Sequence, residues 1–121
     1  MTAGDKRLQK RVKISLPVDI VDLLNNRRCV GRITDISAGG VSFLTNAAIE
    51  AETPLSIAFS FEGCDFKNIA ADVVRCKKIE AHYFIAVVFF DMDPLIAETL
   101  DLRVRHVFSR TERGMQRGKL I

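Results

Sequence analysis

Apolar and polar residues alternate through most of the stretch between residues 14 and 90, which predicts β-strands. Residues 14–20, ISLPVDI, place four aliphatic side chains on one side of a strand. Pro17 faces the other way, and it suits an edge or a bulge because proline cannot donate to a ladder. Residues 55–61, LSIAFSF, give the clearest alternation. Further strands are predicted over about 29–36 and 41–45, and from the turn at 62–65 to about residue 78.

The sixth strand is predicted over residues 82–90, HYFIAVVFF, which are almost all β-branched or aromatic. Such a continuous apolar run favours a strand that is covered on both faces. Two polar stretches separate strands: NNRR at 25–28 is predicted to form a hairpin turn, and EGCD at 62–65 a second turn.

The pattern changes from strand to helix at residue 93. Asp93 is a typical N-cap and Pro94 suits the first helical position. Apolar residues then recur at helical spacing, and we expect a helix of four to five turns with a frayed end from about residue 112. These residues are Ile96, Leu100, Val104 and Val107.

Six short strands followed by one helix predict a mostly β fold, a small six-stranded antiparallel barrel with a C-terminal α-helix. Closure of the barrel would remove the sheet edges that six strands otherwise leave exposed. A length of 121 residues suits one domain. We therefore expect a flexible basic arm over 1–13, a barrel domain with its helix over 14–111, and a frayed basic tail over 112–121.

Positive charge is concentrated at the two ends of the chain. Residues 1–13 carry five Lys or Arg and one Asp, and residues 101–121 carry six Lys or Arg and two acids, so each end has a charge of +4. The middle, 14–100, has seven basic and twelve acidic residues, or −5. Solvated tails are often charged, so this distribution has a purely structural explanation as well as a functional one.

The composition points to a cytoplasmic domain. Hydrophobic residues make up 48% and charged residues 27%, which is typical of a folded chain. No window approaches the roughly 20 apolar residues that a membrane span needs, and the basic start has no apolar run behind it. The three cysteines are widely spaced and odd in number, which argues against a disulfide framework or a zinc site and favours a reducing compartment.

The sequence does not indicate an enzyme. Ser37 is not in the strand–elbow–helix context of a nucleophile, and His82 and His106 fit surface or boundary positions. Carboxylates show no metal or acid–base spacing beyond ordinary surface usage, and no Gly-rich phosphate loop precedes a helix. We expect no cofactor.

Two polar stretches carry the candidate chemistry, RLQKR at 7–11 and DISAGG at 35–40. A structural reading of the second is sufficient, because Asp and Ser can bond back to backbone N–H groups and glycines permit tight turns. A functional reading is that a carboxylate accepts hydrogen bonds from a guanine edge, while Arg7 and Arg11 can bond guanine or clasp phosphate. Together they suit a ligand with guanine bases and phosphate charge.

These motifs resemble those of the PilZ family. Arg7-x-x-x-Arg11 followed by Asp35-x-Ser37-x-x-Gly40 is similar to the family's paired RxxxR and [D/N]xSxxG motifs. RVKISLPVDI, DISAGGVSF and VVRCKKIEAHYFIAVVFFDMDP are similar to its first strand, its central motif and its closing strands. The chain departs from the family in Lys6, where many members have Arg, and in Ala86, where Gly is common.

The resemblance implies a receptor for the bacterial second messenger cyclic di-GMP, with an N-terminal arm that wraps over the ligand. It implies that the arginines contact guanine edges and phosphates, that Asp35 and Ser37 hold guanine, and that Gly40 admits the ligand against the turn. Lys10 and Lys6 would assist electrostatically. A receptor of this kind would relay its signal to another, unidentified protein, with motility, adhesion and polysaccharide export all open.

Two alternatives remain at this point. One is a ligand-independent member of the same family that serves only as a protein-interaction module. The other is a small nucleic-acid-binding barrel that uses both basic ends. Nucleic acid is disfavoured because the chain has one Tyr and no Trp, and most of its Phe lie at core-type spacing, which leaves few residues to stack bases.

Overall fold

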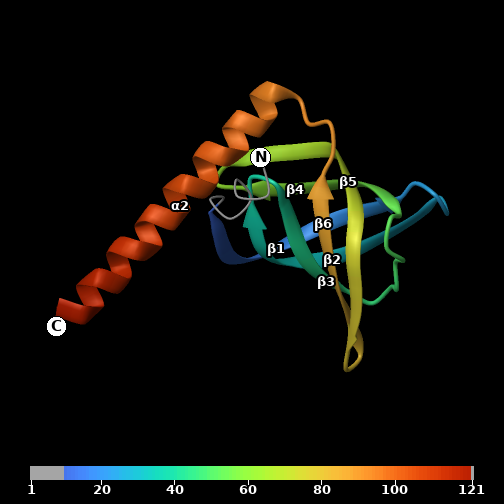
Figure 1. Ribbon diagram of the computed structural model, residues 1–121, viewed down its shortest axis with the longest axis horizontal. Coiled ribbons are helices and arrows are strands. Elements are labelled where there is room, and N and C mark those ends of the chain that lie inside the picture. Colours follow the sequence, from blue (N-terminus) through green and yellow to red (C-terminus); the bar gives the residue numbers. More distant parts are fainter. Residues whose placement is uncertain (1–9, 121) are drawn as a thin grey trace, which may run out of the picture.

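The computed structural model describes residues 10–120 of the chain, and side chains as far as Thr111. Six strands are followed by one long helix (Figure 1). The elements are β1 Arg11–Asp22, β2 Arg27–Ser37, β3 Gly40–Thr45, β4 Pro54–Phe61, β5 Cys64–Ile79, β6 His82–Phe89 and α2 Pro94–Leu120.

The strands form a closed antiparallel barrel in the order β1-β2-β3-β6-β5-β4. Pairing of β1 with β4, from Asp19↔Ala58 to Asp22↔Leu55, joins the two ends of the sheet. The predicted fold class, a mostly β six-stranded antiparallel barrel with a C-terminal helix, is therefore confirmed. Closure removes the unpaired edges that an open sheet of this size would present to other chains.

The barrel interior is filled by aliphatic and aromatic side chains from alternate positions of the strands. Val18 and Ile20 of β1 are buried as the alternation predicted, and β1 contains a bulge between Lys13 and Leu16. The rings of Phe59 and Phe66 stack with centroids 5.3 Å apart. The core is thus built from the period-2 pattern of the sequence, and polar residues are left for the outer face.

The first hairpin turn lies at residues 23–26, two residues earlier than the predicted NNRR turn. The reason is Asp22, whose side chain is 3% exposed. Its Oδ1 accepts hydrogen bonds from the backbone N–H groups of Leu24 and Asn25, both at 3.0 Å. Its Oδ2 accepts from the Asn25 amide at 3.0 Å and from Arg27 at 3.3 Å. The carboxylate thereby fixes the turn ahead of Arg27, where β2 begins.

The same contacts set the pKa of Asp22. Burial acts to raise this pKa, but the hydrogen bonds from Asn25, Arg27 and the Leu24 N–H together hold it below its ordinary value of 3.8. Asp22 is therefore a carboxylate whose charge stabilises the hairpin at neutral pH.

Among the described residues, strand β6 is buried on its inner face and only partly covered on its outer face, which corrects the expectation of two covered faces. Ile85 and Val87 are buried in the barrel, whereas Val88 is 39% exposed and Phe90, just after the strand, is 59% exposed. The helix does not extend over the outer face of β6, because its main contacts are with β1 and β2. An apolar run can therefore belong to a strand with one partly covered face.

Helix α2 begins as predicted. Asp93 Oδ1 accepts hydrogen bonds from the N–H groups of Leu95 at 2.8 Å and Ile96 at 3.4 Å, so Asp93 is the N-cap. Three of the four predicted apolar positions, Leu100, Val104 and Val107, are buried, and the fourth, Ile96, is 37% exposed.

The helix is longer than expected. It has 27 residues, about seven turns, and its backbone is helical to Leu120 rather than to about residue 111. Figure 1 shows its C-terminal part extending away from the barrel. The predicted domain boundary at residues 13/14 also shifts, because β1 begins at Arg11. Arg11 thus belongs to the barrel rather than to an arm.

Candidate ligand-binding site

Strands β1 and β2 bring Arg11, Asp35 and Ser37 together at one end of the barrel. The ladder pairs Arg11 with Ser37 and Lys13 with Asp35. Arg11 Nη1 donates to Asp35 Oδ1, and Arg11 Nη2 donates to Ser37 Oγ at 3.4 Å. The Arg11 side chain is 51% exposed and that of Asp35 is 21% exposed, so the pair can be reached from solvent.

Ser37 connects this pair to the turn that follows β2. Its Oγ accepts from the Gly39 N–H at 3.2 Å and donates to the Gly40 carbonyl oxygen at 3.3 Å. Ser37 is also the ladder partner of Gly40, the first residue of β3. The serine hydroxyl therefore positions the turn as well as facing the Arg11 guanidinium.

Gly40 is explained by the close approach of strand β6. A Cβ added at residue 40 would lie 2.1 Å from the Val87 carbonyl oxygen. Only glycine allows β3 and β6 to pair at this distance. A structural reason for this glycine therefore exists whether or not it also admits a ligand.

The structure places the remaining predicted site residues apart from this cluster or does not describe them. Lys10 Nζ lies 4.8 Å from the centroid of the Phe108 ring, so this lysine contacts helix α2. Arg7 and Lys6 lie outside the described residues. The contact between Lys10 and the helix could not be read from the sequence, because nothing in the pattern pairs residue 10 with residue 108.

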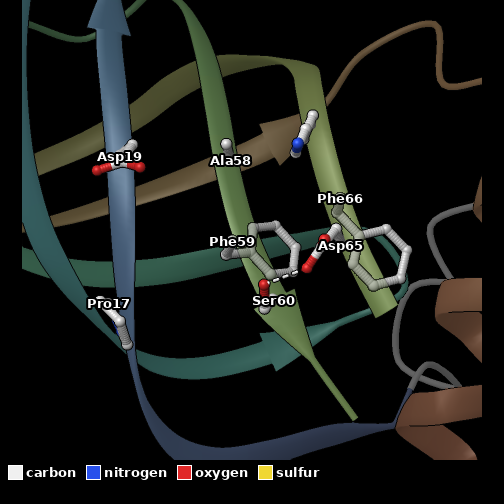
Figure 2. A pocket seen from close by; sticks show the side chains of 8 residues that line it. Pro17, Asp19, Ala58, Phe59, Ser60, Asp65 and Phe66 are labelled. Carbon is white, nitrogen blue, oxygen red and sulfur yellow. Dashed lines mark hydrogen bonds between the residues drawn. The ribbon is translucent and has the colours of Figure 1, made fainter. Parts of the chain in front are cut away.

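A hollow of about 300 Å³ lies on another part of the barrel, where β1 and β4 separate beyond Asp19 and Ala58. Figure 2 shows the acidic side chains of Asp19 and Asp65 in its lining, with Ser60 donating a hydrogen bond to Asp65. The lining also contains one cation, Lys67, so its formal charge is −1, which disfavours a phosphate-bearing ligand at this position. The candidate site is instead the open outer face around Arg11 and Asp35.

Among the described side chains, those of residues 10–111, no three His, Cys, Asp or Glu are close enough together to hold a metal ion. Within residues 10–120, no helix combines the length and the apolar character that crossing a bilayer requires.

Comparison with solved structures shows the fold to be that of PilZ proteins. YcgR of Escherichia coli in complex with c-di-GMP superposes with a TM-score of 0.70 at 17% identity, over 92% of this chain and 48% of YcgR. The isolated YcgR PilZ domain with c-di-GMP superposes with a TM-score of 0.66 at 14% identity, over 93% of this chain and 97% of the isolated domain. MrkH of K. pneumonia in complex with c-di-GMP superposes with a TM-score of 0.72 at 14% identity, over 88% of this chain and 54% of MrkH.

The chain thus spans about half the length of the YcgR and MrkH chains and nearly all of the isolated domain. Comparison with curated protein sequences gave no match. The class that this fold defines is a small β-barrel with a polar motif on its outer face. The sequence profile of the PilZ domain matches residues 5–109, and the chain belongs to the PilZ domain family.

PilZ domains are non-catalytic receptor domains for cyclic di-GMP. The family therefore agrees with the expectation that this chain is not an enzyme, and the predicted resemblance is confirmed.

Proposed function

We propose that this protein is a cyclic di-GMP receptor that binds its ligand at Arg11, Asp35, Ser37 and Gly40, with Arg7 from the preceding segment. The observation that carries the proposal is the cluster itself. Arg11 donates side-chain hydrogen bonds to Asp35 and Ser37, which lie 24 and 26 positions later in the chain, at a solvent-accessible point of the barrel.

The chemistry of the cluster suits guanine. The carboxylate of Asp35 gives one oxygen to Arg11 and keeps acceptor sites for the N1–H and N2–H₂ edge of a base. Arg11 presents a planar fork of donors that can turn to guanine O6 and N7 or to a phosphate oxygen. The Arg11–Asp35 ion pair therefore holds both groups in place before a ligand arrives.

The balance of energies allows binding in the micromolar range. Fixing the backbone of any segment of about seven residues costs on the order of 10 kcal/mol. Charge-assisted hydrogen bonds contribute about 1.5–3 kcal/mol each, and stacking on a base about 1–3 kcal/mol. Four such hydrogen bonds and two stacking contacts would give about 8–18 kcal/mol, so contacts near the upper end of these ranges offset the ordering and reach the roughly −8 kcal/mol of a micromolar complex.

The signal then passes to another protein, because the bound ligand and the arginines around it form a surface that the empty barrel lacks. Lys10 directly precedes Arg11 and contacts Phe108 of α2. We therefore expect a conformational change at the site to affect this helix. The cytoplasm is the compartment in which such a second messenger acts.

Calorimetric titration of cyclic di-GMP tests the proposal. The wild-type protein is expected to bind saturably, and Arg11→Ala and Asp35→Ala to bind at least tenfold more weakly. Arg28→Ala is the matched control, because Arg28 is an exposed residue at the far end of β2 and its loss removes the same charge. Absence of binding by the folded wild-type protein would refute the receptor and favour the protein-interaction alternative.

A further inference from the structure

The hairpin formed by β5 and β6 extends beyond the other strands of the barrel. Figure 1 shows it as a two-stranded ribbon that protrudes at the bottom of the view. Strand β4 pairs with β5 only as far as Asp72, and the Val73 N–H then donates to the Thr53 carbonyl oxygen at 3.1 Å. Within the described part of the chain, residues 74–79 have β6 as their only neighbouring strand. The ribbon therefore has an open edge on its β5 side.

Backbone groups of β5 point toward this open edge at alternate residues. Ile79 and His82 flank a two-residue turn, and residues in this position form a hydrogen-bonded pair in a hairpin. Hydrogen-bonded and non-hydrogen-bonded pairs alternate along an antiparallel ladder, so Cys76 and Lys78 direct their N–H and C=O groups away from β6. Such a row of unpaired backbone groups is a template to which another extended segment can add.

Three cations lie along the same edge. Arg75, Lys77 and Lys78 are exposed, and none of them forms an ion pair with a described carboxylate. Glu80, in the turn, is the one acidic residue of the segment 74–82, which therefore has a formal charge of +2 with its histidine neutral. Because successive side chains of a strand point to opposite faces, Lys77 and Lys78 make both faces of the edge cationic.

The cations determine which kind of strand can add to the edge. If two copies of the chain paired antiparallel about the point between Cys76 and Lys77, Arg75 of each copy would lie opposite Lys78 of the other. Like charges directly opposite each other destabilise a strand pair, and opposite charges stabilise it. Lysines on an open edge therefore disfavour a second copy of this chain, and they favour a strand that carries carboxylates.

We propose that the open edge of β5, residues 74–79, binds an extended acidic segment of a partner protein by strand addition. The added segment hydrogen-bonds the backbone of Cys76 and Lys78, and its carboxylates face the exposed cations of the edge. The inference goes beyond the proposed function and does not depend on it, because the open edge is present without cyclic di-GMP. It gives the unidentified partner a stated chemistry, an acidic segment in the β conformation.

A synthetic peptide of about ten residues that alternates Glu and Val is the probe, since it favours a strand with its carboxylates on one face. In titration calorimetry at low ionic strength, without cyclic di-GMP, this peptide is expected to bind saturably. A peptide that alternates Lys and Val is expected not to bind. Amide hydrogen exchange at Cys76 and Lys78 is expected to slow in the complex. No saturable binding of the acidic peptide, or equal binding of the basic one, would overturn the inference.

Charge reversals on β5 test the position of the peptide. Lys77→Glu and Lys78→Glu are each expected to weaken binding about fivefold, because an attractive cross-strand pair becomes a repulsive one. Lys67→Glu is the matched control, since Lys67 is an exposed cation in the stretch of β5 that runs beside β4, and less than a twofold effect is expected. Circular dichroism melting confirms that each variant is folded. Equal effects of all three reversals would show that binding follows net charge, and would overturn the assignment to this edge.

A peptide of the same acidic sequence, methylated on every amide nitrogen, separates strand addition from charge attraction. Methylation keeps the carboxylates and removes the backbone donors, so binding is expected to weaken about tenfold or more. Unchanged affinity would mean ion pairing alone and would overturn strand addition. Sedimentation of the protein without peptide is expected to give a species whose mass does not depend on these lysines. A dimer with slow exchange at Cys76 and Lys78 would place a second copy on the edge and would also overturn the inference.

Discussion

Replacing Gly40 by alanine is expected to destabilise the barrel even when no ligand is present. The new Cβ would lie 2.1 Å from the Val87 carbonyl oxygen and 3.2 Å from the Val88 Cα. Strand β6 cannot withdraw alone, because β3 and β5 pair with it on its two sides. Overpacking costs about 1–3 kcal/mol, and one weakened ladder hydrogen bond costs about 0.5–1.5 kcal/mol. The expected loss in free energy of unfolding is therefore about 2–4 kcal/mol.

Urea denaturation of the protein without ligand measures this loss. Gly63→Ala is the matched control, because Gly63 has a φ of 79° but nothing within 4 Å of an added Cβ, so its cost is backbone strain of about 1 kcal/mol. At about 4 °C per kcal/mol, the melting temperature of Gly40→Ala should fall by roughly 8–16 °C. A loss no greater than that of Gly63→Ala would refute the steric argument and return Gly40 to a role in ligand contact alone.

Three further predictions concern stability. Asp22→Asn should lower the free energy of unfolding by about 1–3 kcal/mol near pH 7 in urea titrations, because charged hydrogen bonds are lost. Since the folded pKa of Asp22 lies below 3.8, its contribution is present above about pH 4 and is lost as pH falls through the folded pKa. The difference from wild type should therefore shrink below pH 4, and a constant difference would contradict the charge-based argument. Lys10→Ala and Phe108→Leu should show a coupling of about 0.5–1 kcal/mol in a double-mutant cycle, and additive effects would mean that the contact contributes nothing. The exposed Arg110–Glu62 pair, 3.2 Å apart, should contribute less than about 1 kcal/mol in the same kind of cycle, and a larger coupling would show that it anchors the helix.

The barrel could be predicted from the sequence because each strand is short and has one buried face. Leu55 to Phe61 alternate in the sequence and alternate in burial, and the N-cap of α2 was recognisable from Asp93 and Pro94. These features depend on neighbours in the chain. A single sequence therefore predicts well which alternate residues of a strand are buried and where a helix is capped.

The parts that could not be predicted depend on residues far apart in the chain. Arg11 was assigned to an arm because the segment around it is basic, but its pairing with Ser37 makes it the first residue of β1. The helix was expected to fray from about residue 112, where the apolar positions at helical spacing end, but its backbone is helical to Leu120. The burial of β6 on one face alone depends on where α2 packs, which no strand pattern reports.

The motif residues could be named from the sequence, but the face that they belong to could not. The spacing of Asp35, Ser37 and Gly40 marks one turn, and Arg75 is 40 positions away from Asp35 in the chain. Only the ladder register, with its bulges in β2 and β5, places Arg75 in the same row of the outer face as Asp35.

The position of Lys10 and Arg11 gives the proposed receptor a physical route for its signal. Arg11 is bound to Asp35 on the barrel, and Lys10, one residue earlier, lies against Phe108 on α2. A ligand that competes for Arg11 changes the balance of its contacts with Asp35 and Ser37. On the proposed function, we expect a ligand-induced change at Arg11 to be felt first by the adjacent Lys10 and its contact with the helix.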